Sequence, residues 1–160
     1  MTEDTLKLKP LSTQESQTFL DLIYDDYTQS MLEAKAGYPD ASVKQYSKES
    51  IDEALPKGIE TKDNYFYGLF SEECHARIWF AIEQDCGIDI AFLYYIHVDE
   101  KYRRQGLASE VLKQFEAMMK SKFKAEKICL SVFGGNHAAQ ALYKKLGFET
   151  YTERMIKSVI

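Results

Sequence analysis

The sequence predicts an α/β fold built on a mixed, mostly antiparallel sheet, and three observations support this prediction. Three strand-like runs follow one another with separators short enough for antiparallel turns. The third run leads through a loop into an amphipathic helix and a further strand, and such a unit forms a right-handed parallel crossover. Two helical segments precede the three runs. The predicted order is strand, two helices, three strands, helix, strand, helix, strand.

The elements before the three runs can be placed from alternation, spacing and capping residues. Thr5 to Lys9 alternates apolar and polar residues and predicts a short strand. Ser12 and Glu15 have the spacing of a capping box, which predicts the start of a helix there. Apolar residues then recur at helical spacing until Gly37 ends the helix. A second, shorter helix is expected from about Ser47 to Leu55.

The strand-like runs cover residues 65–70, 77–83 and 88–98. The third is rich in aromatic and β-branched residues, as expected for a strand that is buried on both faces. The loop from Asp99 to Gln105 follows, and the next helix carries one continuous apolar stripe.

The C-terminal part is expected to contribute a strand, a helix and a closing segment. The strand covers residues 128–133, and Asn136 can cap a helix that runs through Leu146, with Gly147 just beyond it. Residues 148–160 are expected to form one or two closing strands.

Length and composition favour one domain over residues 1–160. The chain has 160 residues, of which 45% are apolar, which is enough for one packed core. No apolar run approaches the roughly 20 residues needed to cross a bilayer, so a membrane location is not expected. The acidic N-terminus lacks the basic start and apolar stretch of a secretory signal, which predicts a cytoplasmic location.

Charge and cysteine content narrow the function classes. The net charge of −5 argues against nucleic-acid binding and is compatible with a cationic amine substrate. The cysteines Cys74, Cys86 and Cys129 form no C-x-x-C pair, so we expect free thiols in a reducing compartment. No cluster of histidine, cysteine or aspartate has metal-ligand spacing, and no metal is expected.

The segment between the third run and the following helix predicts a phosphate site. A helix start leaves backbone N–H groups without partners and carries partial positive charge, which suits a phosphate group. Gly106 allows close approach of the backbone, and Lys101 adds positive charge. Alternatively, Gly106 only turns the chain. The segment matches neither of two known phosphate-binding motifs, the Walker A loop and G-x-G-x-x-G. The candidate phosphate-binding residues are Arg103, Arg104, Gln105, Gly106, Leu107 and Ala108.

Two motifs together resemble those of the GCN5-related N-acetyltransferase (GNAT) superfamily, in particular its small bacterial members without an assigned substrate. The pattern [QR]-x-x-G-x-[GA] is met by Arg103, Gly106 and Ala108. The pattern N-x-x-A-x-x-L-Y-x-K-x-G-F is met by Asn136, Ala139, Leu142, Tyr143, Lys145, Gly147 and Phe148. The resemblance is residue-level from about Phe92 to Phe148, and before that it is a match of element order.

The resemblance implies a GNAT-like fold with about four helices and a splayed parallel strand pair at the centre of the sheet. Acetyl-CoA is then the cosubstrate, with its pyrophosphate on the N–H groups from Arg104 to Ala108. Its pantetheine arm is expected to pair with the backbone from Ile96 through His97 to Val98, and Asn136 to hydrogen-bond the arm. Tyr143 is expected near the thioester sulfur as the acid that protonates the leaving thiolate. Alternatively, Tyr143 is a half-buried tyrosine that packs on the sheet.

The implied reaction is direct acetyl transfer to a primary amine in a ternary complex. The acceptor, a small-molecule or peptide amine, stays open, as does the choice between monomer and homodimer. A non-catalytic acyl-CoA-binding or sensing module is the alternative from another class. A third possibility is transfer of longer acyl chains, against which several bulky aromatic residues argue. These aromatic residues are Phe92, Tyr94, Tyr95 and Phe133.

The general base and the acceptor site have several candidates each. His97 titrates in the right range, but a strand histidine in solvent or in the core is an equal alternative. The candidate bases are Glu83, Asp89, Tyr94, Tyr95 and His97. Carboxylates and rings of the first two helices can hold a cation, or they form a solvated helix face. These residues are Tyr24, Asp25, Asp26, Tyr27, Tyr38, Glu49, Asp52 and Glu53.

Overall fold

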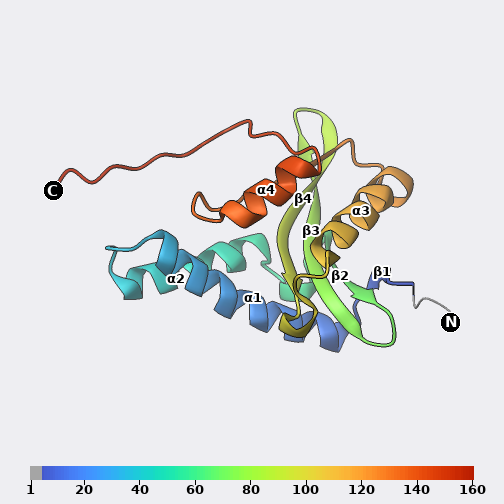
Figure 1. The fold of residues 1–160 in the computed structure, drawn as a ribbon. Helices are drawn as coiled ribbons and strands as arrows, with labels where there is room; N and C mark the ends of the chain where they lie inside the picture. Colours follow the sequence, from blue (N-terminus) through green and yellow to red (C-terminus); the bar gives the residue numbers. More distant parts are fainter. Residues whose placement is uncertain (1–4) are drawn as a thin grey trace.

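A computed structural model describes residues 5–160 and confirms the α/β class with four helices and a five-stranded mixed sheet (Figure 1). The acidic start, on which the cytoplasmic location was predicted, lies outside the described residues. The strands are β1 (Lys7–Pro10), β2 (Asn64–Phe70), β3 (Cys74–Asp85), β4 (Ile88–Val98) and β5 (Lys127–Leu130). The helices are α1 (Thr13–Ala34), α2 (Asp40–Ala54), α3 (Leu107–Met118) and α4 (His137–Lys145).

The sheet follows the chain in the order β1-β2-β3-β4-β5. The first four strands are antiparallel neighbours, and β5 is parallel to β4. The predicted order of elements is therefore confirmed up to α4, and β4 has the predicted bounds. A tight turn at Cys86 and Gly87, both with positive φ, joins β3 to β4, as is common in two-residue hairpins.

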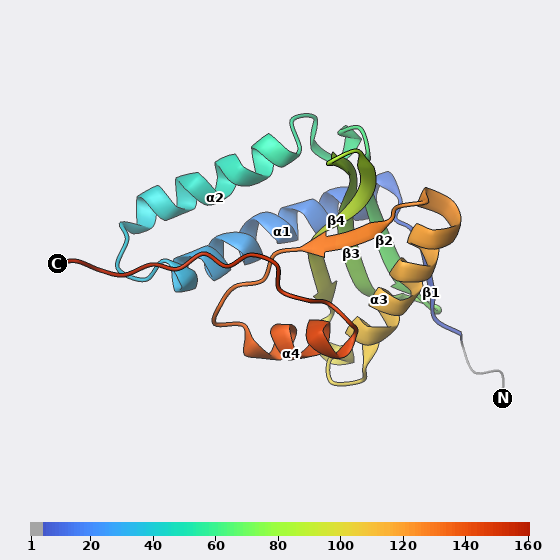
Figure 2. The ribbon, with the colours of Figure 1, turned by 90° about the horizontal axis from the view of Figure 1, so that it is seen from above.

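Helices cover both faces of the sheet. Figure 2 shows α1 and α2 along one face and α3 and α4 along the other. On the α1–α2 face, Phe19 and Ile23 are buried against Trp79 of β3. On the α3 face, Phe80 is buried against Phe115, with their ring centroids 4.9 Å apart. The sheet thus separates two cores, each formed by alternate residues of the same strands.

The helix that follows β1 begins where the sequence predicts, but α2 begins earlier. Ser12 Oγ accepts from the Glu15 N–H at 3.1 Å and Ser12 N donates to the Glu15 carboxylate at 3.0 Å, which completes the capping box. In contrast, α2 starts at Asp40 instead of Ser47. Pro39 is extended and can precede a helix, and Asp40 puts negative charge at the helix start. The buried face of α2 begins four residues before Ser47, with Val43.

Residues 148–160 form no strand, contrary to the prediction, and the chain leaves the body of the molecule there (Figure 1). β-Propensity alone does not form a strand, because the backbone must also find a pairing partner. As a result, the parallel pair β4–β5 lies at one edge of the sheet, and not at its centre as predicted. β5 also ends at Leu130, before the expected residue 133.

No helix within residues 5–160 combines the length and the apolar character that a membrane-crossing segment needs.

Candidate active site

The strands β4 and β5 separate part of the way along their length. Their pairing extends from Ile90 to Leu93 on β4, whereas β4 continues beside β3 to Val98. Tyr94 lies in a bulge of β4, because Phe80 pairs with Leu93 and Trp79 with Tyr95. A bulge bends a strand and increases its twist. The residues of β4 beyond Leu93 therefore have no strand partner on the β5 side within residues 5–160.

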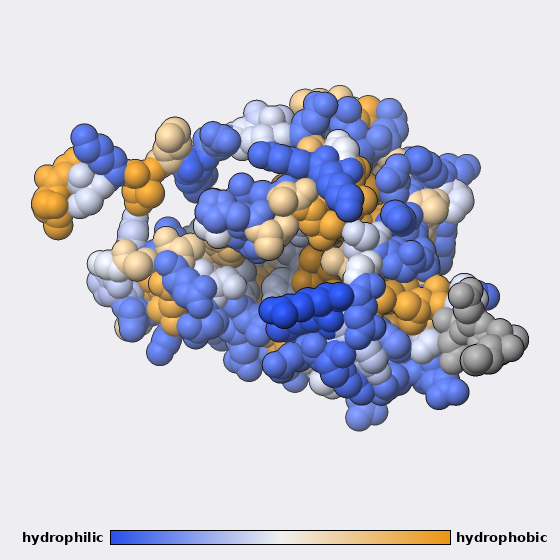
Figure 3. Space-filling view, viewed as in Figure 1, coloured by the Kyte–Doolittle hydropathy of each residue, from blue (hydrophilic) through white to orange (hydrophobic). Residues whose placement is uncertain are grey.

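A cavity of about 510 Å³ opens beside this separation. Figure 3 shows a hollow in the middle of one face of the molecule, with apolar surface inside it. Its walls come from both helical layers, from the strands and from the segment after β5. The aromatic residues that line it are Tyr27, Trp79, Phe92, Tyr94, Tyr95, Phe133 and Tyr143. The Trp79 and Tyr94 rings are stacked, with their centroids 4.4 Å apart, so this wall is tightly packed.

The loop between β4 and α3 presents backbone N–H groups that have no acceptor. Gly106 is the N-cap of α3 and has a φ of 73°, and Arg104 has a φ of 62°. The first turn of α3 closes with Glu110 N donating to the Gly106 carbonyl at 3.1 Å. None of the N–H groups from Arg104 to Ala108 donates a hydrogen bond to any residue in 5–160. Such a group of N–H donors at a helix start suits an anion.

Side chains of the loop hold its shape. Arg103 Nε donates to the Val98 carbonyl at 3.0 Å, and Gln105 Nε2 donates to the Lys101 carbonyl at 3.4 Å. Lys101 Nζ lies 3.0 Å from a carboxylate oxygen of Glu73. Among the predicted phosphate-binding residues, Arg103 and Gln105 therefore use their side chains to support the loop. The backbone of the loop is left as the main source of donors.

Asn136 and Tyr143, the two predicted site residues near α4, both line the cavity. Asn136 Oδ1 caps α4 by accepting from Ala139 N at 3.2 Å, which leaves its amide NH₂ without an acceptor in the described part of the chain. The Tyr143 ring packs edge-on against Phe148, with centroids 5.6 Å apart. Burial raises the pKa of Tyr143, so its hydroxyl is protonated at neutral pH. That hydroxyl has no hydrogen-bond partner among residues 5–160 and remains available to a ligand.

Two cavity tyrosines each donate a hydrogen bond to a carboxylate. Tyr94 donates to Glu83 at 2.7 Å, and Tyr95 donates to Asp26 at 2.7 Å. The pKa of each tyrosine is raised, first by burial and then by its carboxylate partner. Both hydroxyls are therefore protonated and linked to a proton acceptor. Of the five candidate bases, Glu83 and Tyr94 form one of these pairs and Tyr95 belongs to the other; Glu83 itself does not line the cavity.

The remaining candidate bases lie apart from the cavity lining. The His97 ring lies between two carboxylates, with Nδ1 3.6 Å from Asp26 Oδ2 and Nε2 3.5 Å from Asp99 Oδ1. Burial lowers the pKa of His97, and the two carboxylates partly oppose this shift. Asp89 accepts a hydrogen bond from Gln84 near the β3–β4 turn. Neither His97 nor Asp89 belongs to the residues that line the cavity.

The predicted acceptor region is only partly near the cavity. Tyr27 lines it, whereas Tyr24 and Asp52 are hydrogen-bonded to each other and Tyr38 is exposed. Burial, followed by the hydrogen bond to Asp52, raises the pKa of Tyr24 to about 12. Sequence reasoning missed several lining residues, although the buried face of α2 and the alternation of β3 would have placed some of them. The missed residues are Ile23, Ser30, Ser50, Ile51, Ala54, Trp79, Leu93, Leu130, Ser131 and Val132.

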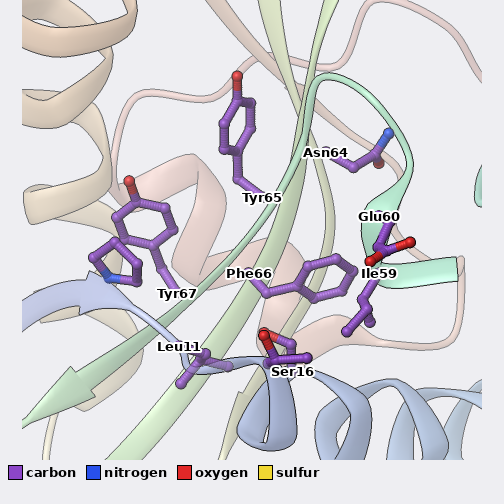
Figure 4. A pocket seen from close by; sticks show the side chains of 10 residues that line it. Leu11, Ser16, Ile59, Glu60, Asn64, Tyr65, Phe66 and Tyr67 are labelled. Carbon is purple, nitrogen blue, oxygen red and sulfur yellow. The ribbon is translucent and has the colours of Figure 1, made fainter.

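A second hollow of about 300 Å³ lies between the start of α1, β2 and the 3-10 turn Gly58–Glu60 (Figure 4). It is lined by Leu11, Phe66 and Ile59 among others, and none of the predicted site residues reaches it. Residues 5–160 also contain no cluster of three or more histidine, cysteine, aspartate or glutamate side chains that could hold a metal ion.

Comparison with known proteins places this arrangement in context. A model of the acetyltransferase (GNAT) family matches residues 20–148. YycN of Bacillus subtilis (strain 168), named an uncharacterized N-acetyltransferase, is 27% identical over 147 residues, which cover 91% of this chain and 93% of YycN. The crystal structure of YycN aligns with a TM-score of 0.88 at 26% identity, over 98% of this chain and 99% of that one.

Two more distant proteins also match this chain, one by sequence and one by fold. YdgE of Bacillus subtilis (strain 168), also named an uncharacterized N-acetyltransferase, is 21% identical over 154 residues, covering 95% of this chain and 97% of YdgE. The aminoglycoside N-acetyltransferase AAC(6')-Iy in complex with CoA aligns with a TM-score of 0.58 at 16% identity. That alignment covers 96% of this chain and 93% of the aminoglycoside enzyme.

The position of His97 between two carboxylates predicts a measurable titration. We expect its imidazole to titrate below the ordinary pKa of about 6.5, because burial disfavours the charged ring. Asp26→Asn removes an attraction that raises this pKa and should lower it further. The three histidines can be followed by NMR over a pH series, with His97→Gln for assignment.

The same shift has a consequence for stability. Below about pH 6.5 the unfolded chain binds the proton more readily than the folded chain, so His97 makes the folded state less stable as pH falls toward its lowered pKa. The exposed neighbour variant Asp25→Asn should leave the titration of His97 unchanged. A His97 pKa above 6.5 in the wild type would contradict the interpretation.

Proposed function

Because this chain belongs to the acetyltransferase (GNAT) family, we propose that it transfers an acetyl group from acetyl-CoA to a primary amine by direct attack in a ternary complex. The observation that carries the proposal is the run of unpaired N–H groups from Arg104 to Ala108, which directly follows β4. A diphosphate carries the charge that such donors favour. The open edge of β4 and the aromatic cavity continue from that loop.

The donor is proposed to occupy the gap where β4 and β5 separate. Its pyrophosphate receives the loop N–H groups, and its pantetheine arm pairs with the free backbone edge of β4 near Ile96. The Val98 carbonyl already accepts from Arg103, and the backbone groups of His97 face Arg77 of β3, so Ile96 supplies the backbone contacts at this end of the strand. The free amide NH₂ of Asn136 donates to the same arm. The acetyl group then lies in the cavity with Tyr143.

The reaction needs one attack and three proton transfers: the alkylammonium nitrogen loses one proton to the proton acceptor of the enzyme and a second that restores the Tyr143 hydroxyl, and the leaving thiolate gains one. The amine nitrogen attacks the acetyl carbonyl carbon, the carbon–sulfur bond breaks, and the leaving thiolate takes the proton of the Tyr143 hydroxyl. Backbone N–H groups of β4 favour the charge that develops on the carbonyl oxygen. An alkylamine has an ordinary pKa of roughly 10.4, so the enzyme must also accept a proton from the nitrogen. The raised pKa of Tyr143 keeps it in the proton-donating form.

We assign the acceptance of the amine proton to the pair Tyr94–Glu83. The amine passes its proton to the Tyr94 hydroxyl while that hydroxyl gives its own proton to Glu83, 2.7 Å away. Tyr94 is 37% exposed and lies in the β4 bulge, where the amine can reach it. In the second pair, Tyr95 packs against Phe19 and its partner Asp26 also lies close to His97. Asp26 is therefore the less available acceptor.

The cavity walls suggest the acceptor class and the acyl size. Aromatic faces attract an alkylammonium group before it loses its proton, and Tyr94, which is stacked on the buried Trp79 and is 37% exposed, offers such a face. The same bulky rings leave room for a small acyl group and argue against a long chain. A small-molecule or peptide amine is proposed as the acceptor.

Donor binding is predicted to depend on Gly106. In Gly106→Val a β-branched residue must adopt a φ of 73° and covers the N–H groups, so we expect the Kd for acetyl-CoA to rise at least about tenfold. Isothermal titration calorimetry measures this directly. Gly87→Val is the matched control, because Gly87 has a φ of 89° in a turn away from the loop. It should lose stability and keep its affinity. Absence of both binding heat and thermal shift with the wild-type protein would refute the proposed function.

Turnover is predicted to depend on Tyr143. Tyr143→Phe keeps the ring and its contact with Phe148 but removes the acid, so kcat should fall on the order of 100-fold while acetyl-CoA affinity changes little. Amine-dependent release of CoA thiol provides the assay. It also distinguishes an acetyltransferase from a module that binds acyl-CoA without catalysis. Tyr151→Phe, at an exposed position, is the control. Wild-type turnover in Tyr143→Phe would exclude this residue as the acid.

Glu83 is predicted to be the final proton acceptor, and a comparison of carboxylate variants tests this prediction. Glu83→Gln should lower kcat/KM by about 100-fold near pH 7, because the amide cannot take the proton from Tyr94. Asp89→Asn, on the same hairpin but bonded to Gln84 and not to a tyrosine of the cavity, should behave like the wild type. If Asp26→Asn loses more activity than Glu83→Gln, the Tyr95–Asp26 pair holds the role instead.

A further inference from the structure

The walls of the cavity beside β4 carry no charged side chain. Among residues 5–160, the lining of its volume of about 510 Å³ includes no aspartate, glutamate, lysine, arginine or histidine. The inside of the hollow is correspondingly apolar (Figure 3). Charged residues make up 28% of the whole chain, so their absence from this wall is a property of the cavity and not of the composition. The wall therefore limits the charge that a bound molecule can carry.

The polar groups of the α1–α2 side of the cavity are neutral hydroxyls. They belong to Tyr27, Ser30 and Ser50. Burial raises the pKa of Tyr27, so its hydroxyl stays protonated and uncharged at neutral pH. Ser50 Oγ donates to the Tyr46 carbonyl at 2.8 Å. This side of the cavity therefore offers hydrogen bonds to a ligand but no counter-charge.

Two carboxylates contact the cavity wall, each through a tyrosine. Glu83 accepts from Tyr94 and Asp26 accepts from Tyr95, and neither carboxylate lines the cavity. Asp26 also lies 3.6 Å from His97 Nδ1, so its charge already has a second neighbour. The Tyr94 ring, with Glu83 behind its hydroxyl, is therefore the position that suits an ammonium group. The cavity can serve one cation there.

The remainder of the cavity is lined by aromatic rings from several parts of the chain. The rings of Tyr27 on α1 and Phe133 after β5 are stacked, with their centroids 6.5 Å apart. Phe92 and Tyr94 of β4 lie 4.7 Å apart, and Tyr94 also stacks on Trp79 of β3. Aromatic rings pack favourably by face and by edge against another ring. Such walls suit an apolar ligand body that itself contains a ring.

We propose that the acceptor is a small primary monoamine whose body is apolar, has the size of one aromatic ring and carries no second charged group. This proposal rests on the acetyl transfer proposed above and specifies its acceptor. The single ammonium group lies at Tyr94 and Glu83, where it loses its proton, and the ring packs against the aromatic walls. A second ammonium or a carboxylate would lose water in the cavity without gaining a counter-charge, which strongly disfavours its entry. Diamines, amino acids and sugars with several amino groups are therefore expected to be poor acceptors.

The first test compares acceptors that differ in one charged group. With saturating acetyl-CoA, release of CoA thiol gives kcat/KM for two pairs: pentylamine with 1,5-diaminopentane, and phenylethylamine with phenylalanine. The more highly charged member of each pair should be at least about tenfold poorer, and phenylethylamine should be the best of the four. A more highly charged member that equals its partner overturns the proposal. An alanine tripeptide amide that exceeds phenylethylamine also overturns it, because the cavity then serves a peptide.

Trp79 allows the same preference to be measured without turnover. It is the single tryptophan of the chain, and it lines the cavity. In the presence of CoA, phenylethylamine should change the fluorescence of Trp79, and pentylamine should displace it at a lower concentration than 1,5-diaminopentane. The reverse order overturns the acceptor class, while thiol release with any amine would leave the acetyl transfer standing. The expected order without thiol release supports the class and refutes the transfer.

The second test introduces a charge into the wall. Ser30→Asp places a carboxylate on the α1–α2 side of the cavity, so kcat/KM for 1,5-diaminopentane relative to pentylamine should rise about tenfold. Ser30→Asn has a similar shape without the charge and should leave this ratio unchanged. Gln29→Asp adds the same charge at an exposed neighbouring position of α1 that does not line the cavity, and it should also leave the ratio unchanged.

Circular dichroism checks that each of these variants is folded. A ratio that rises equally in Ser30→Asp and Gln29→Asp, or in neither of them, overturns the proposal, because the wall of the cavity then does not select the acceptor by charge.

Discussion

The separation of β4 from β5 is the constraint on which the rest of the site depends. The two strands share a parallel ladder only over Ile90–Leu93, and the bulge at Tyr94 turns the remainder of β4 away. A continuous ladder would satisfy the β4 edge with protein and would close the cavity. Because the ladder stops, the edge of β4 stays open, and Asn136 at the start of α4 lines the cavity beside it. The family relationship is the reason for proposing that the acetyl donor occupies this gap.

Inside the gap, burial and hydrogen bonding set the protonation states. Tyr94, Tyr95 and Tyr143 are all kept in their neutral form by partial burial, but only the first two have carboxylate partners. The three tyrosine hydroxyls therefore differ in the proton transfers that they can make. Those linked to a carboxylate can pass a proton onward, and the unpartnered one can give its proton away. This difference follows from neighbours and not from residue type.

Motifs that act locally were predictable, whereas features that depend on distant partners were not. The capping box of Ser12 and the bounds of β4 could be read from neighbouring residues. The pairing of Tyr95 with Asp26 joins residues 69 positions apart, which no local pattern reports. The strand character of residues 148–160 was recognisable, but a strand needs a partner, and the described chain offers none beside it. The site roles predicted from the family motifs remain proposals that the geometry supports.

The sheet also separates the substitutions that affect one helical layer from those that affect the other. Asn136 and Tyr143 approach the gap from one layer, whereas Tyr27 and the lining residues of α2 approach it from the other. The two layers have separate cores, so substitutions in one are weakly coupled to packing in the other. A lineage can therefore diversify the α1–α2 wall, and with it the proposed choice of amine, while the half proposed to hold the acetyl donor stays the same.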